Sequence, residues 1–418
     1  MNTLEKAQMV IVGAGHCGGR AAQALRELGW TGGIHLVGDE VYAPYERPPL
    51  SKDLLTGEKL AQDCALWSEQ AMADLDITRH TARVVGIDPV ARRITLANQH
   101  TLTYQSLLLA TGGKVRKLTI PGGDLPGVMT LRGLDDAAAL AKRLVTGHRL
   151  LVVGGGFIGL EVAASARKLG CLVDLIEGAP RLMGRAVPEP VAACALALHR
   201  AKGVRVLLGV NPLSIAAQST GLSVSLSDGS SIEVDTVVTG IGIEPATELA
   251  KSAGLRVERG IVVDAMLQTS HSGIYAAGDV AEFPSGLSGQ LLRQETWQNA
   301  ELQAFAVARN ILGQQEIYTS QPWFWSDQYD HQLQVMGEPA LAVSEVTREL
   351  GQLGGGGLII FYLNAENCLV GACGWGQTSR IVKELKLTRM LVEKQACVAA
   401  EVLKDPLMSL KALLKAAS

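Results

Sequence analysis

Two short glycine-rich segments carry the clearest chemistry in this chain. Residues 13–18 read Gly-Ala-Gly-His-Cys-Gly, and residues 154–159 read Gly-Gly-Gly-Phe-Ile-Gly, so both fit G-x-G-x-x-G. In this pattern the first glycine permits a tight turn, the second lets the backbone approach a pyrophosphate, and the third permits close packing of a helix on a strand. A helix beginning there offers free N–H groups and a positive dipole end to phosphate oxygens. We therefore expect two dinucleotide-binding sites.

The elements that must position these two segments follow from the hydrophobic pattern. Each segment comes directly after an apolar run typical of a buried parallel strand, and each is followed by a helical pattern and a second apolar run. The expected strand, helix and strand are residues 9–13, 18–28 and 34–37 in the first case and residues 150–153, 159–169 and 172–177 in the second. This internal repeat of a βαβ unit predicts two nucleotide-binding modules.

An acid about 20 residues after the glycines is expected to hold ribose hydroxyls. In the first module Asp39 and Glu40 occupy that region; we favour Asp39, and the sequence does not separate the two. In the second module Glu177 ends the strand. A carboxylate there accepts the 2′-hydroxyl and repels a 2′-phosphate, which favours NADH over NADPH. Arg181 keeps the alternative open, because an arginine in this loop can also accept a phosphate.

Further elements complete the α/β pattern. We expect strands over residues 106–110, 237–239 and 273–277, a hairpin around Asp228-Gly229, and a helix over residues 296–312 with Thr296 as its N-cap. After residue 322 the sequence changes to Trp-Phe-Trp and alternating apolar residues, which are typical of antiparallel strands. We therefore expect a separate α+β domain from residue 323 to the end.

Composition narrows the classes of protein. The chain has 418 residues, 47% of them hydrophobic and 19% charged, and a formal net charge of −3. This is a globular composition, and it argues against general binding of nucleic acid or anionic membranes. Seven scattered cysteines form neither a Cys-x-x-Cys pair nor a zinc-ligand spacing. We expect reduced thiols, no metal site, no signal peptide and no spanning helix, and hence a soluble cytoplasmic protein.

Several segments together resemble a known family. The paired glycine segments, Ala110-Thr111-Gly112, and residues 276–280 (Ala-Ala-Gly-Asp-Val) look like the two-dinucleotide-binding flavoproteins. Residues 44–52 (Pro-Tyr-Glu-Arg-Pro-Pro-Leu-Ser-Lys), 295–300 (Glu-Thr-Trp-Gln-Asn-Ala) and 322–328 (Pro-Trp-Phe-Trp-Ser-Asp-Gln) narrow the resemblance. They are similar to the FAD-dependent ferredoxin reductases of bacterial oxygenase systems, the putidaredoxin reductase and aromatic-ring dioxygenase reductase family. The resemblance covers essentially the whole chain.

The resemblance implies an architecture and a set of site residues. It implies two Rossmann-like domains and a C-terminal α+β domain: residues 1–115 with 248–322 for FAD, 116–247 for NAD, and 323–418. The FAD-binding residues it implies are Gly13, Ala14, Gly15, Gly18, Asp39, Arg47, Lys52, Val84, Ala110, Thr111, Gly112, Arg132, Asp279, Trp297 and Trp325. The NAD-binding residues it implies are Gly154, Gly156, Ile158, Gly159, Glu177, Arg181 and Gly242.

The resemblance also implies roles at the flavin. Arg47 and Lys52 would lie at the isoalloxazine ring, and Asp279 would bind the ribityl chain. Trp297 opens a helix whose N-terminus would face the flavin N1–C2 edge and stabilise negative charge there. Lys52 and Glu161 are the catalytic residues it implies, paired at the flavin N5 edge.

Each role has an alternative. Lys52 could be a solvated lysine, Asp279 a helix cap, and Glu161 an acid in a first helical turn that complements the dipole. Trp323 or Trp325 would lie near the ring or where electrons leave, and either could instead be a core aromatic residue.

The implied reaction is a hydride transfer followed by single-electron transfers. NADH would lie along the second module with its nicotinamide near Glu161 and Gly242, and hydride would pass to FAD. Electrons would then leave one at a time to a 2Fe–2S ferredoxin that serves an oxygenase. Alternatives are a rubredoxin reductase and an NADH-sensing interaction flavoprotein of the apoptosis-inducing-factor type.

Cysteine placement argues against a disulfide reductase. Those enzymes need a redox-active cysteine pair in the first module, but residues 42–47 read Tyr-Ala-Pro-Tyr-Glu-Arg. A single-cysteine NADH oxidase or peroxidase is disfavoured for the same reason. Cys17 lies inside the first glycine segment, where a small packing residue is favoured over a redox role. Cys368 and Cys373 are interpreted as packing residues on a strand.

A candidate docking surface lies near the end of the chain. Arg380, Lys383, Lys386 and Arg389 recur at threefold spacing and could form one basic stripe on a helix, suited to an acidic ferredoxin. An ordinary solvated face is the alternative. The sequence leaves open the cognate ferredoxin, the oxygenase and its substrate, and the oligomeric state.

Overall fold

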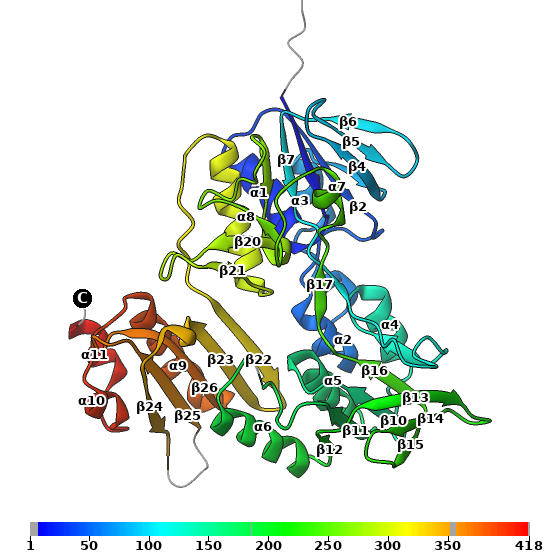
Figure 1. Cartoon of the computed structure of the whole chain (residues 1–418), viewed down its shortest axis with the longest axis vertical. Helices are drawn as coiled ribbons and strands as arrows, with labels where there is room; N and C mark the ends of the chain where they lie inside the picture. The colour runs from blue at the N-terminus through cyan, green and yellow to red at the C-terminus, as the bar shows by residue number, and fades with distance from the viewer. Residues whose placement is uncertain (1–6, 185, 352–356, 417–418) are drawn as a thin grey trace, which may run out of the picture. The chain divides into compact units, whose positions relative to one another are not determined.

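The computed structural model describes residues 7–184, 186–351 and 357–416 (Figure 1). The chain divides into two compact units, each built from three segments. The first unit comprises Met1–Arg47, Gln62–Lys114 and Ile243–Pro322; the second comprises Pro48–Ala61, Val115–Gly242 and Trp323–Ser418.

A five-stranded parallel sheet forms the centre of the first unit. Its strand order is β19-β7-β1-β2-β3. The strands are β1 (Gln8–Val12), β2 (Gly33–Gly38), β3 (Thr78–Thr81), β7 (Ser106–Leu109) and β19 (Ile274–Ala276). Met9, Val10 and Ile11 of β1 are completely buried, as expected for a central parallel strand with both faces covered.

Two helices that pack on each other accompany this sheet, α1 (His16–Glu27) and α8 (Trp297–Ile311). Thr296 caps α8 by accepting a hydrogen bond from the Asn299 N–H, 3.1 Å away, as predicted. The unit's other elements are η2 (Ala61–Cys64), α3 (Glu69–Asp74), β4 (Val84–Asp88), β5 (Arg93–Leu96), β6 (Thr101–Thr103), β8 (Gly113–Val115), β17 (Ile243–Pro245), α7 (Glu248–Ser252), β18 (Ile261–Val262), η3 (Gly278–Val280), β20 (Ala281–Pro284) and β21 (Leu291–Arg293).

The second unit repeats the same plan around a second parallel sheet, of order β12-β11-β10-β16-β9. Its strands are β9 (Val128–Thr130), β10 (Arg149–Val153), β11 (Leu172–Glu177), β12 (Arg205–Leu208) and β16 (Thr236–Thr239). A three-stranded antiparallel sheet follows in each case, β4-β5-β6 in the first unit and β13 (Pro212–Ala217), β14 (Leu222–Leu226) and β15 (Ser231–Val234) in the second. The helices and turns of this part are η1 (Pro48–Ser51), α2 (Asp53–Thr56), α4 (Leu134–Ala141), α5 (Phe157–Lys168) and α6 (Glu189–Ala201).

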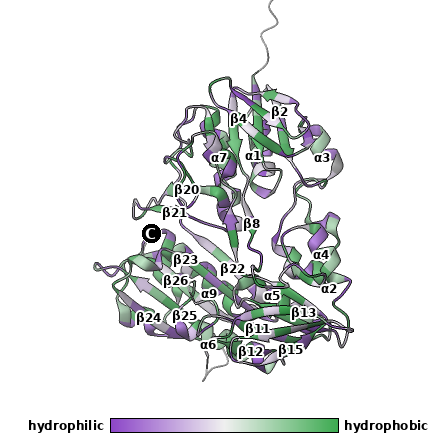
Figure 2. Ribbon diagram, turned by 45° about the vertical axis from the view of Figure 1, so that its right-hand side comes forward, coloured by the Kyte–Doolittle hydropathy of each residue, from purple (hydrophilic) through white to green (hydrophobic). Residues whose placement is uncertain are grey.

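An antiparallel sheet of order β22-β23-β26-β25-β24 lies between residues 323 and 377. Its strands are β22 (Trp323–Gln328), β23 (His331–Gly337), β24 (Ser344–Glu349), β25 (Leu358–Leu363) and β26 (Leu369–Gln377). The helices are η4 (Pro339–Leu341), α9 (Thr378–Glu393), α10 (Ala400–Lys404) and α11 (Leu410–Ala416). Phe361 and Ala372 of the sheet are buried with Ile381 and Leu385 of α9, and β25 and β26 are largely hydrophobic (Figure 2).

The structure confirms the predicted α/β class with two Rossmann-like sheets and a C-terminal α+β region. The predicted strand over residues 172–177 has the same bounds as β11, and the glycine segments stand between strand and helix as expected. Within the described residues, no helix is both long and apolar enough to cross a bilayer.

Two expectations are wrong. Helix α5 begins at Phe157, so Glu161 lies in its second turn, and an interaction with the first-turn dipole does not explain it. Cys368 and Cys397 form a disulfide, so the expectation of reduced thiols throughout fails for this pair. The two cysteines are 29 residues apart and meet because the segment after α9 pairs with the start of β26.

Candidate active site

The two glycine segments, called here the first loop (residues 13–18) and the second loop (residues 154–159), have the same backbone geometry. Their first glycines have φ of +115° (Gly13) and +108° (Gly154), values that favour glycine. A Cβ on Gly18 would lie 1.9 Å from the Gly13 carbonyl oxygen, and one on Gly159 would lie 2.0 Å from that of Gly154. These positions therefore require glycine in both loops.

The middle glycines are different, because they face open space. A Cβ on Gly15 would have its nearest neighbour at 3.9 Å, the Arg47 Nη2 atom, and one on Gly156 would have the Gly240 oxygen at 4.0 Å. Each is the N-cap of the following helix and makes no side-chain capping bond. Each loop thus leaves room and free helix N–H groups for a pyrophosphate, so the chemistry of a bound dinucleotide fits both.

A neighbouring strand end backs each loop. A Cβ on Gly13 would meet the Ala110 oxygen at 2.1 Å, and one on Gly154 would meet the Gly240 oxygen at 2.5 Å. These backing segments continue to Gly112 and Gly242, which both have positive φ. Thr111 is held by donating its hydroxyl to the Ala246 carbonyl, 2.8 Å away.

The acids near the first loop have different surroundings. Glu40 accepts hydrogen bonds from the Tyr45 hydroxyl at 2.5 Å and from Arg47 at 2.6 Å. Asp39 follows β2 with an exposed side chain. Asp39 is the more exposed of the two, and its choice as the ribose ligand stays a prediction.

Trp297 is the first residue of α8, as predicted, and its ring lies 5.2 Å from that of His16. The Trp297 indole donates to Glu46 at 3.3 Å. Asp279 lies in the short turn η3 and its carbonyl accepts a bond from Arg293, so it caps no α-helix. Val84 is buried at the start of β4. All of these residues belong to the first unit.

At the second loop, Glu177 is the last residue of β11. Its carboxylate accepts bonds from the Gly155 N–H at 2.6 Å and the Ala179 N–H at 2.8 Å. Arg181 points its guanidinium at the carbonyls of Gly184 and Val187, at 2.7 and 3.0 Å. This guanidinium is therefore engaged locally, which weakens the case for it as a phosphate ligand. Ile158, by contrast, is exposed beside the loop.

Lys52 and Glu161 come together in the second unit, as the resemblance implies. The Lys52 ammonium lies 3.7 Å from Glu161 Oε1 and 3.2 Å from Asp327 Oδ2, and its side chain is 17% exposed. Lys52 is thus not a solvated surface lysine. Glu161 also accepts hydroxyl bonds from Ser51 at 2.5 Å and Ser326 at 2.7 Å. Burial raises the pKa of Glu161, while Lys52 and the two hydroxyls oppose this rise.

Two tryptophans extend from this cluster. The Trp325 indole donates to Asp327 at 3.0 Å, and the Lys52 ammonium lies 5.8 Å from the centre of the Trp325 ring. Trp323 stacks on Trp325 with ring centres 5.1 Å apart. Of the two, Trp325 is therefore the residue at Lys52.

The four basic residues of α9 do not form one stripe. Threefold spacing on a helix of 3.6 residues per turn drifts by about 60° at each step, so the ends of the series face different ways. Arg380, Lys383 and Lys386 are exposed, whereas the Arg389 guanidinium lies 4.9 Å above the Trp323 ring.

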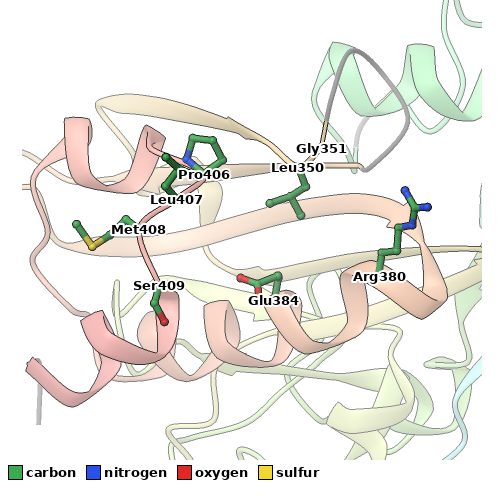
Figure 3. Close-up of a pocket in the computed structure, with 8 residues that line it drawn as sticks. All are labelled: Leu350, Gly351, Arg380, Glu384, Pro406, Leu407, Met408 and Ser409. Carbon is green, nitrogen blue, oxygen red and sulfur yellow. The ribbon is translucent and has the colours of Figure 1, made fainter.

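The predicted site residues do not line the pocket of the C-terminal region. Figure 3 shows this pocket between α9, the end of β24 and the segment after α10, with Arg380 and Glu384 on its wall. Arg132 lies elsewhere, before α4, where its backbone N–H donates to the Asp136 carboxylate at 2.8 Å.

The free cysteines offer no redox pair. Within the described residues, Cys17, Cys64, Cys171 and Cys373 are buried thiols and Cys194 is partly buried. Burial raises the pKa of Cys17, which disfavours the reactive thiolate and supports a packing role in the first loop.

Sequence reasoning missed several partners of the predicted residues. These are Ser51, Ser326 and Asp327 around Lys52 and Glu161, Glu40 beside Arg47, and Glu301, which contacts His16 at 2.6 Å. Ser51, Ser326 and Asp327 belong to residues 44–52 and 322–328, the segments that carry the family resemblance. Their place in these segments is the sequence feature that could have identified them.

Comparisons with known proteins agree with this geometry. Residues 7–304 match the family model described as pyridine nucleotide-disulphide oxidoreductase, and residues 323–414 match the reductase C-terminal model. The ferredoxin–NAD(+) reductase component of the anthranilate 1,2-dioxygenase system of Burkholderia cepacia is 40% identical over 97% of this chain and 98% of its own. The ferredoxin reductase for the CYP199A2 system of Rhodopseudomonas palustris matches with a TM-score of 0.92, 37% identity, and coverage of 98% of this chain and 100% of the other. The covalent putidaredoxin reductase–putidaredoxin complex matches with a TM-score of 0.92, 34% identity, and coverage of 98% and 99%.

Proposed function

The chain belongs to the pyridine nucleotide-disulphide oxidoreductase family, and we propose that it is an NADH-dependent ferredoxin reductase with FAD at the first loop and NADH at the second. Relatives named as ferredoxin–NAD(+) reductase components of dioxygenase systems match over nearly its whole length. The observation that carries the proposal lies in the chain itself. A Lys52–Glu161 pair, joined by Asp327 to stacked tryptophans, is present, and the described free cysteines form no pair.

At the first loop, Gly15 provides the space for a pyrophosphate and α1 provides its N–H groups. Arg47 lies beside this space, where its guanidinium is paired with the Glu40 carboxylate. Asp39 binds the ribose hydroxyls, and Ala110, Thr111 and Gly112 back the loop. Val84, Asp279 and the N-terminus of α8 at Trp297 complete the FAD residues proposed for this unit. Arg132 and Trp325 stay FAD residues that the family resemblance implies.

At the second loop, Glu177 sets the choice of nicotinamide cofactor. Its carboxylate accepts the ribose 2′-hydroxyl and repels a 2′-phosphate, because two anions would meet in the space that Gly155 and Ala179 border. Ile158, Gly242 and the neighbouring glycines line the path of the cofactor. Arg181, which donates to the carbonyls of Gly184 and Val187, is also among the proposed NAD-binding residues. We therefore propose a preference for NADH over NADPH.

When bound, FAD takes a hydride from NADH and releases the two electrons singly. The residues of this chain orient that exchange and control charge around it. Lys52 supplies a fixed positive charge beside Glu161 and Asp327, and Glu161 keeps Lys52 in place. Overall, one NADH reduces two one-electron acceptors and releases NAD⁺ and one proton.

The acceptor is a 2Fe–2S ferredoxin that serves an oxygenase. Trp325 and Trp323 lead from Lys52 toward Arg389 on α9, and Arg380, Lys383 and Lys386 are exposed on the same helix. Exposed cations suit an acidic electron carrier.

We place residues 1–115 and 248–322 in the FAD-binding domain, 116–247 in the NAD-binding domain and 323–418 in the C-terminal domain, and propose that the protein acts in the cytoplasm.

The test is anaerobic reduction of purified 2Fe–2S ferredoxins by NADH in the presence of this protein. The visible absorbance of the iron–sulfur cluster measures the reduction. Ferredoxins should be taken from several aromatic dioxygenase systems. We expect two ferredoxins reduced per NADH, with NADPH far slower. Reduction of the flavin by NADH without acceleration of any ferredoxin would overturn the proposal and favour an NADH-sensing protein of the apoptosis-inducing-factor type.

A further inference from the structure

A buried row of polar side chains leads away from Glu161. It consists of Ser326 and Gln328 on β22 and His199 on α6, and all three are completely buried. His199 Nε2 lies 3.0 Å from Gln328 Oε1, Gln328 Nε2 lies 3.3 Å from Ser326 Oγ, and Ser326 Oγ lies 2.7 Å from Glu161 Oε1. We propose that His199, Gln328 and Ser326 form a one-way hydrogen-bond chain that holds Glu161 in its ionised form, ready to pair with Lys52.

The direction of the chain follows from the donors available at each step. Ser326 has one hydroxyl proton, and because its oxygen accepts from the Gln328 amide, that proton is directed to Glu161. The Gln328 oxygen in turn accepts from His199, which places the imidazole proton on Nε2. Every link therefore donates toward the Glu161 carboxylate, and a carboxylate that accepts such bonds is favoured over the protonated acid.

His199 is suited to the far end of the chain. Burial lowers the pKa of His199 to about 4, so the ring is neutral at neutral pH and carries a single proton. Its other nitrogen, Nδ1, is buried and has no hydrogen-bond partner within the described residues, as fits a nitrogen without a proton. The ring packs edge-on against Tyr329 with centres 5.1 Å apart, which fixes its orientation.

The hydrogen-bond chain matters because opposing effects act on the pKa of Glu161. Burial disfavours its carboxylate, and the groups that oppose this effect are Lys52, at the start of α2, and the hydroxyls of Ser51 and Ser326. Asp327, on β22, acts in the other direction. A bond between a neutral donor and a buried carboxylate is stronger than one between neutral groups. Removing one donor should therefore let Glu161 take up a proton at higher pH and release Lys52.

Gln328 and His199 are linked to Glu161 through Ser326, so they act as positioning residues. The test is a titration of the Glu161 carboxyl in the purified holoenzyme by infrared difference spectroscopy, with the band assigned by its loss in Glu161→Gln. For Ser326→Ala we expect the midpoint to rise by about one pH unit, a tenfold change in proton affinity. Gln328→Met should raise the Glu161 midpoint by a smaller amount. Ser326→Thr keeps the hydroxyl, so its Glu161 midpoint should equal that of the wild-type protein.

Thr388→Val is the matched control, because Thr388 on α9 is completely buried and its hydroxyl has no partner within the described residues. It should leave the Glu161 midpoint unchanged. The inference rests on the proposed function only for its consequence, a parallel shift in the pH profile of flavin reduction by NADH. An unshifted infrared midpoint in Ser326→Ala and Gln328→Met would overturn the inference whatever the ferredoxin assay shows. A shifted midpoint would support it even if no ferredoxin were reduced.

Discussion

The two glycine loops have the same backbone geometry, but different side chains lie beside them. Gly38 at the end of β2 packs against Ala14, whereas Glu177 at the end of β11 lies against Gly155 and accepts its N–H. The first loop has the Arg47 guanidinium at the edge of its open space, and the second has a carboxylate. A cation favours lasting retention of a pyrophosphate, and a carboxylate favours a ribose without a phosphate. We therefore propose a resident cofactor at the first loop and an exchanging one at the second.

The largest expected difference between the two loops is the effect of substituting their middle glycines, Gly15 and Gly156. Gly15 and Gly156 have extended φ of −85° and −81°, and an added Cβ has room at both positions, so valine should leave the fold intact. Gly15→Val should abolish FAD retention, and Gly156→Val should weaken NADH binding about 100-fold, which is about 2.7 kcal/mol, while FAD is retained. Flavin absorbance and NADH titration report the two losses separately.

An equal loss of flavin in both variants would contradict unequal roles for the two loops. The thermal melting temperature of each protein is the control for folding. Gly13→Ala should behave differently from both, since its Cβ would lie 2.1 Å from the Ala110 oxygen and disturb the loop itself.

The second prediction concerns the acid beside the second loop. Glu177→Ala should lower the ratio of kcat/KM for NADH to that for NADPH by about 10- to 100-fold, because the 2′-hydroxyl loses its acceptor and a 2′-phosphate loses its repulsion. Arg181→Gln is the control, since that guanidinium is bonded to the carbonyls of Gly184 and Val187. If Arg181→Gln moves the ratio as far as Glu177→Ala, Glu177 is not the determinant.

The sequence predicted the parts of this comparison that are local. Strand, glycine turn and helix follow one another within about 30 residues, and the spacing of glycines and apolar residues alone determines them. Thr296 was likewise identifiable as an N-cap because its partner, Asn299, is three residues away.

Contacts between distant residues were not predictable in the same way. Cys368 meets Cys397, His16 meets Glu301, and His199 meets Gln328 only because separate elements fold against each other. A periodic pattern also does not predict the direction of a long side chain. Only the structure therefore shows that the Arg389 guanidinium lies over the Trp323 ring.

The third prediction concerns the ferredoxin and the exposed cations of α9. Charge reversal of Lys383 and Lys386 to glutamate should raise the KM for ferredoxin about tenfold at low salt and leave flavin reduction by NADH unchanged. The matched control reverses Lys404 and Lys411, which are exposed on α10 and α11 and change the net charge equally. The same KM in both double variants would show that total charge, not the face of α9, determines the effect.

The smallest expected effect lies at the sheet edges of the two units. His35 and His80 on β2 and β3 contact each other at 3.0 Å, whereas β11 and β12 carry the exposed ion pair of Asp174 and Arg205. Burial lowers the pKa of both histidines below 6.5, and the charge of His80 lowers that of His35 further. The unfolded chain therefore binds protons first as pH falls below 6.5, and stability is lost on acidification.

His80→Gln removes one of the two titrating rings. Its melting temperature should fall less than that of the wild-type protein between about pH 6.5 and pH 5. Equal slopes would contradict the role of this pair. Asp174→Asn should change little over the same interval, because an exposed ion pair contributes about 0–1 kcal/mol.

The most direct test of unequal loops is a crystal structure with FAD and NAD⁺ bound. We expect the FAD pyrophosphate at the N-terminus of α1 beside Gly15, and the NAD⁺ pyrophosphate at the N-terminus of α5 beside Gly156 with its adenosine ribose on Glu177. FAD at the second loop, or NAD⁺ at the first, would contradict the proposed roles of the two loops.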